Sequence, residues 1–238
     1  MNALRNGDAK DTLRLTRQKV TEYQNEFLER MNAIEVDAHW FRRVFHTFGA
    51  SFLFYYLLPE GVWGSIVKIV LPVLLVAILV VVEYRRLHGS LDQKRFFGLR
   101  NYERGRPASY LYFGVALLLL FLFFPQQIAI PCILCASFLD PIIGESRFYF
   151  GRRNAYLVGF FVSLFFFVVC WFRAEWWIVI LVAVVGACGA LVGESKKLRW
   201  LDDDFMIQMV PAVLLVVIWQ GVLWFGVDIL PAKLILPL

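Results

Sequence analysis

Long apolar runs dominate this chain and restrict what it can fold into, and the interruptions between them alternate between very short and strongly charged. The runs cover residues 44–59, 62–82, 108–124, 126–143, 155–172, 176–193 and 205–225. A membrane helix needs about 20 apolar residues, with about 17 as the lower limit, so only the first run is short. With 60% hydrophobic and 18% charged residues, the composition does not fit a soluble domain. The sequence predicts an all-α polytopic membrane protein with about seven transmembrane helices, six or eight being the alternatives.

The segment before the first run has a different pattern. It has no apolar core and is dense in charge, which excludes a secretory leader. Apolar side chains recur at steps of three and four from Val20 to Ile34, a spacing typical of an amphipathic helix. We therefore expect two parts, an N-terminal helix over 1–41 on the cytoplasmic face and a transmembrane catalytic domain over 42–238. A solvated partner-binding helix is the alternative for the first part.

The basic residues predict the orientation. Residues 1–43 contain eight Lys and Arg, 84–107 contain seven, and 144–154 and 194–204 contain three each, which is 21 of the 24 in the chain. If seven helices alternate in direction, these four segments lie on one side, and the positive-inside rule makes that side cytoplasmic. The net charge of +5 is then explained by topology and anionic lipids, without a nucleic-acid partner.

Two short polar motifs flank the first two runs. His46 follows Arg42 and Arg43 by about one helical turn, so the three side chains can share a face. A polar ring just inside a membrane boundary is costly unless it finds a partner, which makes His46 a candidate site residue and Arg43 a candidate beside it. Topological anchoring is the alternative for the arginines. Glu83 and Arg86 are three residues apart and can pair at the end of the second run, as an anchor with one salt bridge.

A third segment begins at Asp140. Pro141 removes a backbone donor and predicts that the helix breaks there, leaving a carboxylate at a broken helix near the membrane boundary. Glycines that permit a close backbone approach and cations that hold phosphate oxygens follow it. The phosphate-binding candidates are Gly144, Arg147, Gly151, Arg152, Arg153, Lys196 and Lys197. An ordinary helix-ending loop with anchoring arginines is the alternative.

The fourth segment is acidic. Asp202, Asp203 and Asp204 are consecutive, and their mutual repulsion would be relieved by a divalent cation. Glu194 lies shortly before them. Oxygen ligands in a partly hydrated site suit Mg²⁺, with phosphate oxygens completing the shell. The alternative is that one aspartate caps the last helix and the others favour its positive end. Because one aspartate suffices for capping, we expect Glu194, Asp202, Asp203 and Asp204 to bind metal.

The order of these motifs resembles a known family. Arg42-Arg43-Val44-Phe45-His46, followed by Gly49, is similar to the Arg-Lys-x-x-His-…-Gly segment of CTP-dependent lipid-alcohol kinases. These are the dolichol, polyprenol, phytol and yeast-type diacylglycerol kinases. Asp140-Pro141 with Gly151-Arg152 resembles their central Gly-Asp-…-Gly-Arg segment. Glu194 and the stretch Asp202–Met209 resemble their late Glu and Asp-Asp-Asn-Leu-Thr-x-Pro-Leu segment.

The resemblance implies phosphoryl transfer from a nucleoside triphosphate, CTP in that family, to a lipid hydroxyl at the cytoplasmic face. By that resemblance Asp140 is the expected base, with metal binding as the alternative, His46 orients a reacting group, and Arg43 is a further catalytic candidate. The cations neutralise developing charge, because such transfer depends mainly on positioning and electrostatics. The Phe-rich spans are expected to bind a polyprenol, dolichol, phytol or diacylglycerol chain.

Two other classes compete with a lipid kinase. A lipid cytidylyltransferase would use the same CTP, Mg²⁺ and acidic residues but would release pyrophosphate. A transporter or scaffold would place polar groups near the bilayer midplane, whereas only Lys68 lies well inside a span. The chain has no G-x-x-x-x-G-K-[ST] loop, which excludes a P-loop ATPase.

Overall fold

A computed structural model describes residues 43–89, 103, 105–195 and 201–238. These residues belong to one compact unit that begins at Arg43. The predicted amphipathic helix over 1–41 lies outside the described residues. Every regular element in the described ranges is a helix, and no strand occurs among them. This agrees with the apolar runs, because a chain in lipid must satisfy its backbone polar groups internally.

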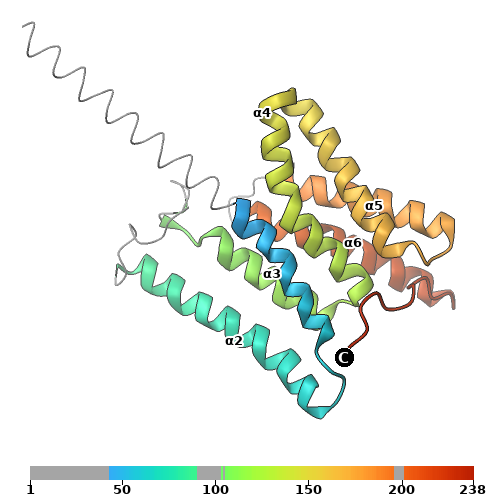
Figure 1. Ribbon diagram of the computed structural model, residues 1–238, viewed down its shortest axis with the longest axis horizontal. Coiled ribbons are helices and arrows are strands. Elements are labelled where there is room, and N and C mark those ends of the chain that lie inside the picture. The colour runs from blue at the N-terminus through green and yellow to red at the C-terminus, as the bar shows by residue number, and fades with distance from the viewer. Residues whose placement is uncertain (1–42, 90–102, 104, 196–200) are drawn as a thin grey trace, which may run out of the picture. The chain divides into compact units, whose positions relative to one another are not determined.

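Figure 1 shows the helices in chain order; most connections between them are short, but 21 residues separate α2 from α3 in the chain. The chain is helical from residue 43 and continues into the 3-10 helix η1. The element bounds are η1 Gly49–Leu57, α2 Val62–Leu87, α3 Ser109–Phe123, α4 Gln126–Trp171, α5 Trp176–Ser195 and α6 Asp203–Trp224. Only two residues separate α3 from α4.

Four of the described helices are long and apolar enough to cross a bilayer, namely α2, α4, α5 and α6. The apolar helix α3 is shorter, with 15 residues. The prediction of an all-helical, multi-pass membrane protein is therefore confirmed. Each predicted run coincides with a helical segment. Two of the runs, 126–143 and 155–172, both lie within α4. The number of crossings stays a prediction.

The fold of α4 corrects one expectation. We predicted that Pro141 would break the helix, but the helix continues through it. The break lies ten residues later, at Gly151, whose φ of 75° and ψ of 170° are not helical. A proline is tolerated in a membrane helix when neighbours satisfy the freed carbonyl, whereas a left-handed φ favours glycine. Gly151 therefore divides α4 into two arms that meet at a tip, visible at the top of Figure 1.

Small residues bring the long helices together. The helix α5 packs against α4 and α6, α6 also contacts α3, and α3 supports α2. A Cβ added to Gly186 would lie 2.6 Å from the ring of Phe167 in α4, and one added to Gly193 would lie 2.6 Å from the Met206 carbonyl oxygen in α6. Such close approach of backbones is typical of membrane helix interfaces. It brings the C-terminal end of α5 against the first turn of α6.

The C-terminal segment, residues 225–238, contacts the start of α4 and the end of η1, on the side of the unit away from the first turn of α6. The Gln127 side chain donates to the Pro231 carbonyl over 2.7 Å, and the Leu238 amide donates to the Leu57 carbonyl over 3.0 Å. An exposed ion pair joins Lys233 to Glu60 over 2.8 Å. The segment therefore holds the start of α4 and the connection between η1 and α2 in one place.

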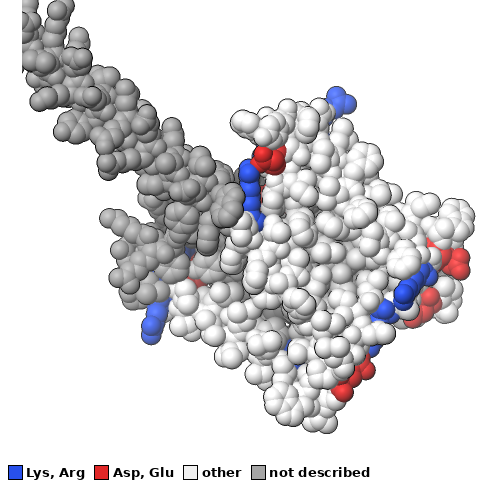
Figure 2. Space-filling view, in the orientation of Figure 1, with Lys and Arg blue, Asp and Glu red and all other residues white. Residues whose placement is uncertain are grey.

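Charged side chains are sparse on the described surface. Figure 2 shows a face that is mostly without them, with Lys, Arg, Asp and Glu gathered near its margins. Apolar side chains along α2 are exposed, including Ile66, Ile69 and Leu74. A helix that is apolar on its exposed side is expected to face lipid, since such a surface in water would be a liability.

Candidate functional site

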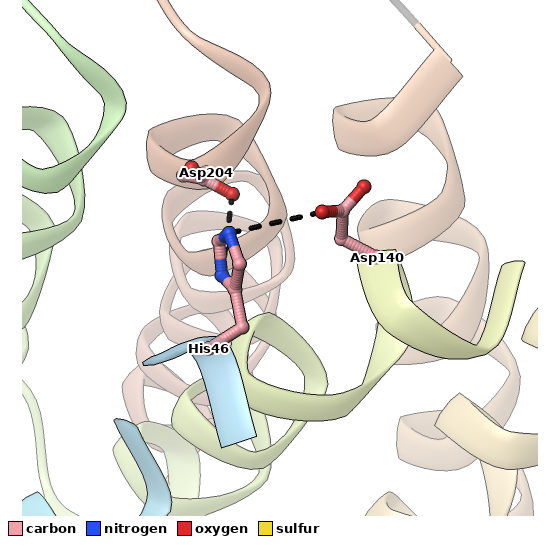
Figure 3. Close-up of side chains that lie close together, drawn as sticks. All are labelled: His46, Asp140 and Asp204. Atoms are coloured by element: carbon pink, nitrogen blue, oxygen red, sulfur yellow. Dashed lines mark ion pairs between the residues drawn. The ribbon is translucent and has the colours of Figure 1, made fainter. Parts of the chain in front are cut away.

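The centre of the candidate site is His46, which lies between two carboxylates from different helices (Figure 3). Its Nε2 is 3.7 Å from the Asp140 Oδ2 in α4, and its Nδ1 is 3.8 Å from the Asp204 Oδ1 in α6. Both distances exceed hydrogen-bond length, which leaves room for a shared cation or water. The ring of Phe113 meets the imidazole edge-on, with centroids 6.4 Å apart.

The acidic residues gather around the same point. Three groups have ligand atoms within 4.8 Å of one another: His46 with Asp140 and Asp204, Asp140 with Glu194 and Asp203, and Asp202 with Asp203 and Asp204. Asp140 belongs to two of these groups and connects α4 to both α5 and α6. The predicted metal ligands are therefore brought together with the predicted base and histidine.

This acidic cluster, defined as Asp140, Glu194, Asp202, Asp203 and Asp204, is mostly buried. Asp140 is 24% exposed, while the other four members are at most 8% exposed. Anions taken out of water at such short separations repel one another strongly, and burial is tolerated only with compensating charge. A divalent cation could supply that charge. Opposite ligands of octahedral Mg²⁺ lie about 4.2 Å apart, which is within the 4.8 Å limit that the ligand atoms of each group satisfy.

Helix capping does not account for the aspartates. Asp202 is the N-cap residue of α6, yet its side chain makes no capping hydrogen bond. Asp203 and Asp204 occupy the first turn, where the positive end of the helix favours negative charge. That effect is worth about 0.3–1 kcal/mol for each charge, which is less than the cost of burying several carboxylates together. The positive end of α6 therefore does not by itself account for the burial of these carboxylates.

Arg43 lies beside the site and is held by a carboxylate. Its Nη1 is 2.5 Å from the Glu145 Oε2, and both side chains are about half exposed, at 45% and 44%. The pair joins the helical turn that carries His46 to the helix that carries Asp140. Arg43 is thus held by Glu145, a partner that we did not predict, and its catalytic role stays a prediction.

The other predicted phosphate-binding residues are less close. Gly144 is helical, and a Cβ added there would meet nothing within 4 Å, so the expected close backbone approach is not observed among the described residues. Arg152 and Arg153 are exposed beyond the break at Gly151. A rise of about 1.5 Å for each helical residue places the tip about 15 Å beyond Asp140. Arg147 lies nearer and stacks over the Tyr156 ring at 5.7 Å. Lys196 and Lys197 lie outside the described residues.

A buried network next to the start of α3 extends well beyond the predicted salt bridge. Arg86, which is 0% exposed, donates to both Glu83 carboxylate oxygens over 2.8 and 2.6 Å. It also donates to the carbonyls of Arg106 and Glu103, over 2.7 and 3.0 Å. The Ala108 amide donates to the Glu83 Oε1 over 2.7 Å. The pair therefore holds Glu103, Arg106 and Ala108 against the end of α2.

Three structural features were not predicted. Glu103, which is 3% exposed, accepts a hydrogen bond from the Ser109 amide over 3.3 Å. Gly193 brings α5 against α6, and the spacing Gly189-x-x-x-Gly193 was the available signal. Gln208 donates to the Asp204 and Phe113 carbonyls over 3.0 and 3.4 Å. This amide replaces the proline of the resembled motif and ties α6 to α3.

No protein-family model, curated protein or solved structure matches this chain. The resemblance to lipid-alcohol kinases therefore rests on the sequence motifs alone.

Proposed function

We propose that this chain is a membrane-embedded kinase that transfers a phosphoryl group from a nucleoside triphosphate to the hydroxyl of a polyprenol- or dolichol-type lipid. CTP is the expected donor from the family resemblance. The observation that supports the proposal is the convergence of His46, Asp140, Glu194, Asp203 and Asp204 at one end of an apolar helical unit. A lipid hydroxyl and a charged nucleotide can meet where a bilayer ends.

The proposal includes a topology. We infer that the seven helical segments each cross the membrane, that the N-terminus is cytoplasmic, and that the acidic cluster faces the cytoplasm. The positive-inside distribution of Lys and Arg supports this orientation. The ends that carry Arg43, Glu145 and the acidic cluster meet at one end of the unit. The hydrogen bonds of residues 225–238 with Gln127 and Leu57 lie at the other end of the unit.

In the proposed reaction, the acceptor hydroxyl oxygen attacks the γ-phosphorus and the bond from that phosphorus to the β-bridging oxygen breaks. Asp140 accepts the hydroxyl proton, since it is the most exposed member of the acidic cluster. His46 orients Asp140 from a distance of 3.7 Å. The products are the lipid monophosphate and the nucleoside diphosphate.

Charge neutralisation is the other requirement. Glu194, Asp202, Asp203 and Asp204 are proposed to hold Mg²⁺, which when bound would neutralise the phosphates. Arg43 supplies a cation at the site, and Lys196 and Lys197 follow Glu194 closely in sequence. The low dielectric around buried groups strengthens these interactions in the transition state.

The decisive experiment uses purified protein in detergent micelles with Mg²⁺, γ-labelled CTP or ATP, and a panel of lipid alcohols. The expected result is transfer of label to a lipid alcohol, lost on the order of a hundredfold or more in Asp140→Asn and Asp203→Asn. Asp228→Asn is the matched control. Asp228 is an exposed carboxylate at the other end, where its Oδ1 accepts from the Trp219 indole and the Leu230 amide over 3.0 Å.

Other outcomes separate the alternatives. Pyrophosphate release with phosphatidic acid would identify a cytidylyltransferase instead. Absence of any transfer, with folded protein and every lipid tested, would contradict enzymatic use of the acidic cluster.

A further inference from the structure

The tip of α4, defined as residues 147–153, has no role in the proposed reaction. Three consecutive aromatic side chains lie in it, and all are exposed, Phe148 by 83%, Tyr149 by 66% and Phe150 by 62%. Gly151 turns the chain at this point with its positive φ. Large aromatic side chains at an exposed helix turn are unfavourable in water and are typical of a membrane–water interface.

The charge of the tip has one sign. Arg147, Arg152 and Arg153 flank the aromatic side chains, and the chain contains no Asp or Glu from residue 146 through residue 174. Arg152 and Arg153 are exposed. Basic side chains next to exposed aromatic rings complement an anionic lipid surface, where each Lys or Arg strengthens attachment.

Packing between the two arms shows how far the tip extends. A Cβ added to Gly159 would lie 2.6 Å from the Ile143 side chain and 3.3 Å from that of Leu139. The arms are therefore in register near Ile143 and Gly159, and each continues for eight residues to Gly151. At about 1.5 Å for each residue, the tip stands about 12 Å beyond that level.

That distance is greater than the thickness of the headgroup layer. The polar layer adds about 5–8 Å on each side of the hydrocarbon core. If the level of Ile143, which follows Asp140 by three residues in α4, is at the hydrocarbon boundary, the tip stands about 4–7 Å beyond the headgroup layer. Long Arg side chains can reach back into that layer.

We propose that the tip of α4 is a binding surface for anionic phospholipid headgroups of the surrounding bilayer. Phe148, Tyr149 and Phe150 insert among the headgroups, and Arg147, Arg152 and Arg153 hold lipid phosphates. Nucleotide phosphates share this chemistry, but the tip lies about 15 Å along α4 from Asp140 and no acidic ligand for a metal nucleotide belongs to it. The inference depends on membrane insertion and not on kinase activity.

A fluorescence experiment on the full chain tests the proposal. Phe150→Cys is labelled with an environment-sensitive dye in a Cys188→Ala background, since Cys132, Cys135 and Cys170 are buried and Cys188 is exposed. The protein is reconstituted in nanodiscs of phosphatidylcholine alone or mixed with phosphatidylserine. We expect a blue shift and a gain in intensity with phosphatidylserine that high salt reverses.

Substitution of the arginines provides a second test of the proposal. Arg152→Gln with Arg153→Gln should lower the ratio of docked to undocked tip about 25-fold, or about fivefold for each arginine. Arg173→Gln is the matched control, because this arginine stacks on Phe172 at the other end of the same arm. Equal emission in both nanodiscs would overturn the proposal. A response to Mg²⁺ and CTP in phosphatidylcholine alone would also overturn it and assign the tip to nucleotide phosphate.

Discussion

The backbone of Gly193 in α5 lies directly against the backbone of Met206 in α6. A Cβ added to Gly193 would be 2.6 Å from both the carbonyl carbon and the carbonyl oxygen of Met206. Real Cβ atoms do not approach other atoms this closely, so the two helices could not keep their separation with any larger residue. Glu194 and Asp203, which flank this contact, are thereby brought into one group with Asp140.

Gly193→Ala is therefore expected to separate α5 from α6 at the site. Forcing a methyl group into a packed contact costs about 1–3 kcal/mol, and activity should fall further because the acidic cluster is spread. The melting temperature can be followed by reaction of the buried cysteines with a thiol-reactive dye, in a Cys188→Ala background. Gly221→Ala is the control, since a Cβ there meets nothing within 4 Å. Equal melting temperatures for the two variants would contradict the tight contact.

His46→Gln should lower the apparent affinity of the enzyme for Mg²⁺, because the imidazole lies between two carboxylates of the acidic cluster. A group that orients or ligates at a metal site typically contributes about 10–100-fold in affinity, so the Mg²⁺ concentration for half-maximal rate should rise by about that factor. The rate at each Mg²⁺ concentration measures this. His88→Gln is the control, because His88 is exposed and its Nδ1 lies 2.9 Å from the Tyr84 carbonyl. A lower rate with an unchanged Mg²⁺ dependence would leave His46 an orienting role towards Asp140 alone.

Arg86→Met should strongly destabilise the protein. Removing the guanidinium leaves the Glu83 carboxylate buried without its ion-pair partner and also releases the carbonyls of Glu103 and Arg106. Breaking such a buried pair costs about 3–5 kcal/mol. The double variant Glu83→Gln, Arg86→Met should recover part of this loss in the same melting experiment, because no buried charge remains. Arg85→Met, on the exposed side of the same turn, should change stability by no more than about 0.5 kcal/mol. No recovery in the double variant would show that the carbonyl contacts dominate.

The C-terminal segment allows a prediction about pH. The hydrogen bond from the Lys233 ammonium lowers the pKa of the Glu60 carboxyl from its ordinary value of 4.5. A lowered pKa in the folded state stabilises the protein above the ordinary value, and the effect is lost as pH falls through the lowered pKa. Lys233→Met should thus show a small, salt-sensitive deficit in melting temperature at neutral pH that vanishes in acid. A deficit of equal size at acid pH would contradict the ion pair.

Gln127→Leu tests the same segment without a charge. It removes the buried donor to the Pro231 carbonyl and should cost about 1–3 kcal/mol at every pH, because a buried acceptor is left unpaired. The melting temperatures of Gln127→Leu and Lys233→Met are compared at acid and at neutral pH. Only the deficit of Lys233→Met should vanish in acid, which distinguishes the ion pair from the hydrogen bond.

Local properties of the sequence predicted the helices well. Apolar runs placed every described helix, since hydrophobicity and helix periodicity act over neighbouring residues. The pairing of Glu83 with Arg86 followed from their spacing. The break in α4 did not, because the effect of Pro141 depends on whether surrounding helices satisfy its free carbonyl, and here the helix bends instead at Gly151.

The sequence by itself predicted an all-helical membrane protein and the polar residues that are candidates for a functional site. Only the tertiary structure decided which of them meet. His46, Asp140, Glu194 and Asp203 come from four separate helical segments, and the close contacts of α5 with α4 and α6 bring them together. Arg152 and Arg153, equally plausible in the sequence, are carried away along α4. Helix formation depends on near neighbours, whereas helix packing depends on the shapes of side chains that are far apart in the chain.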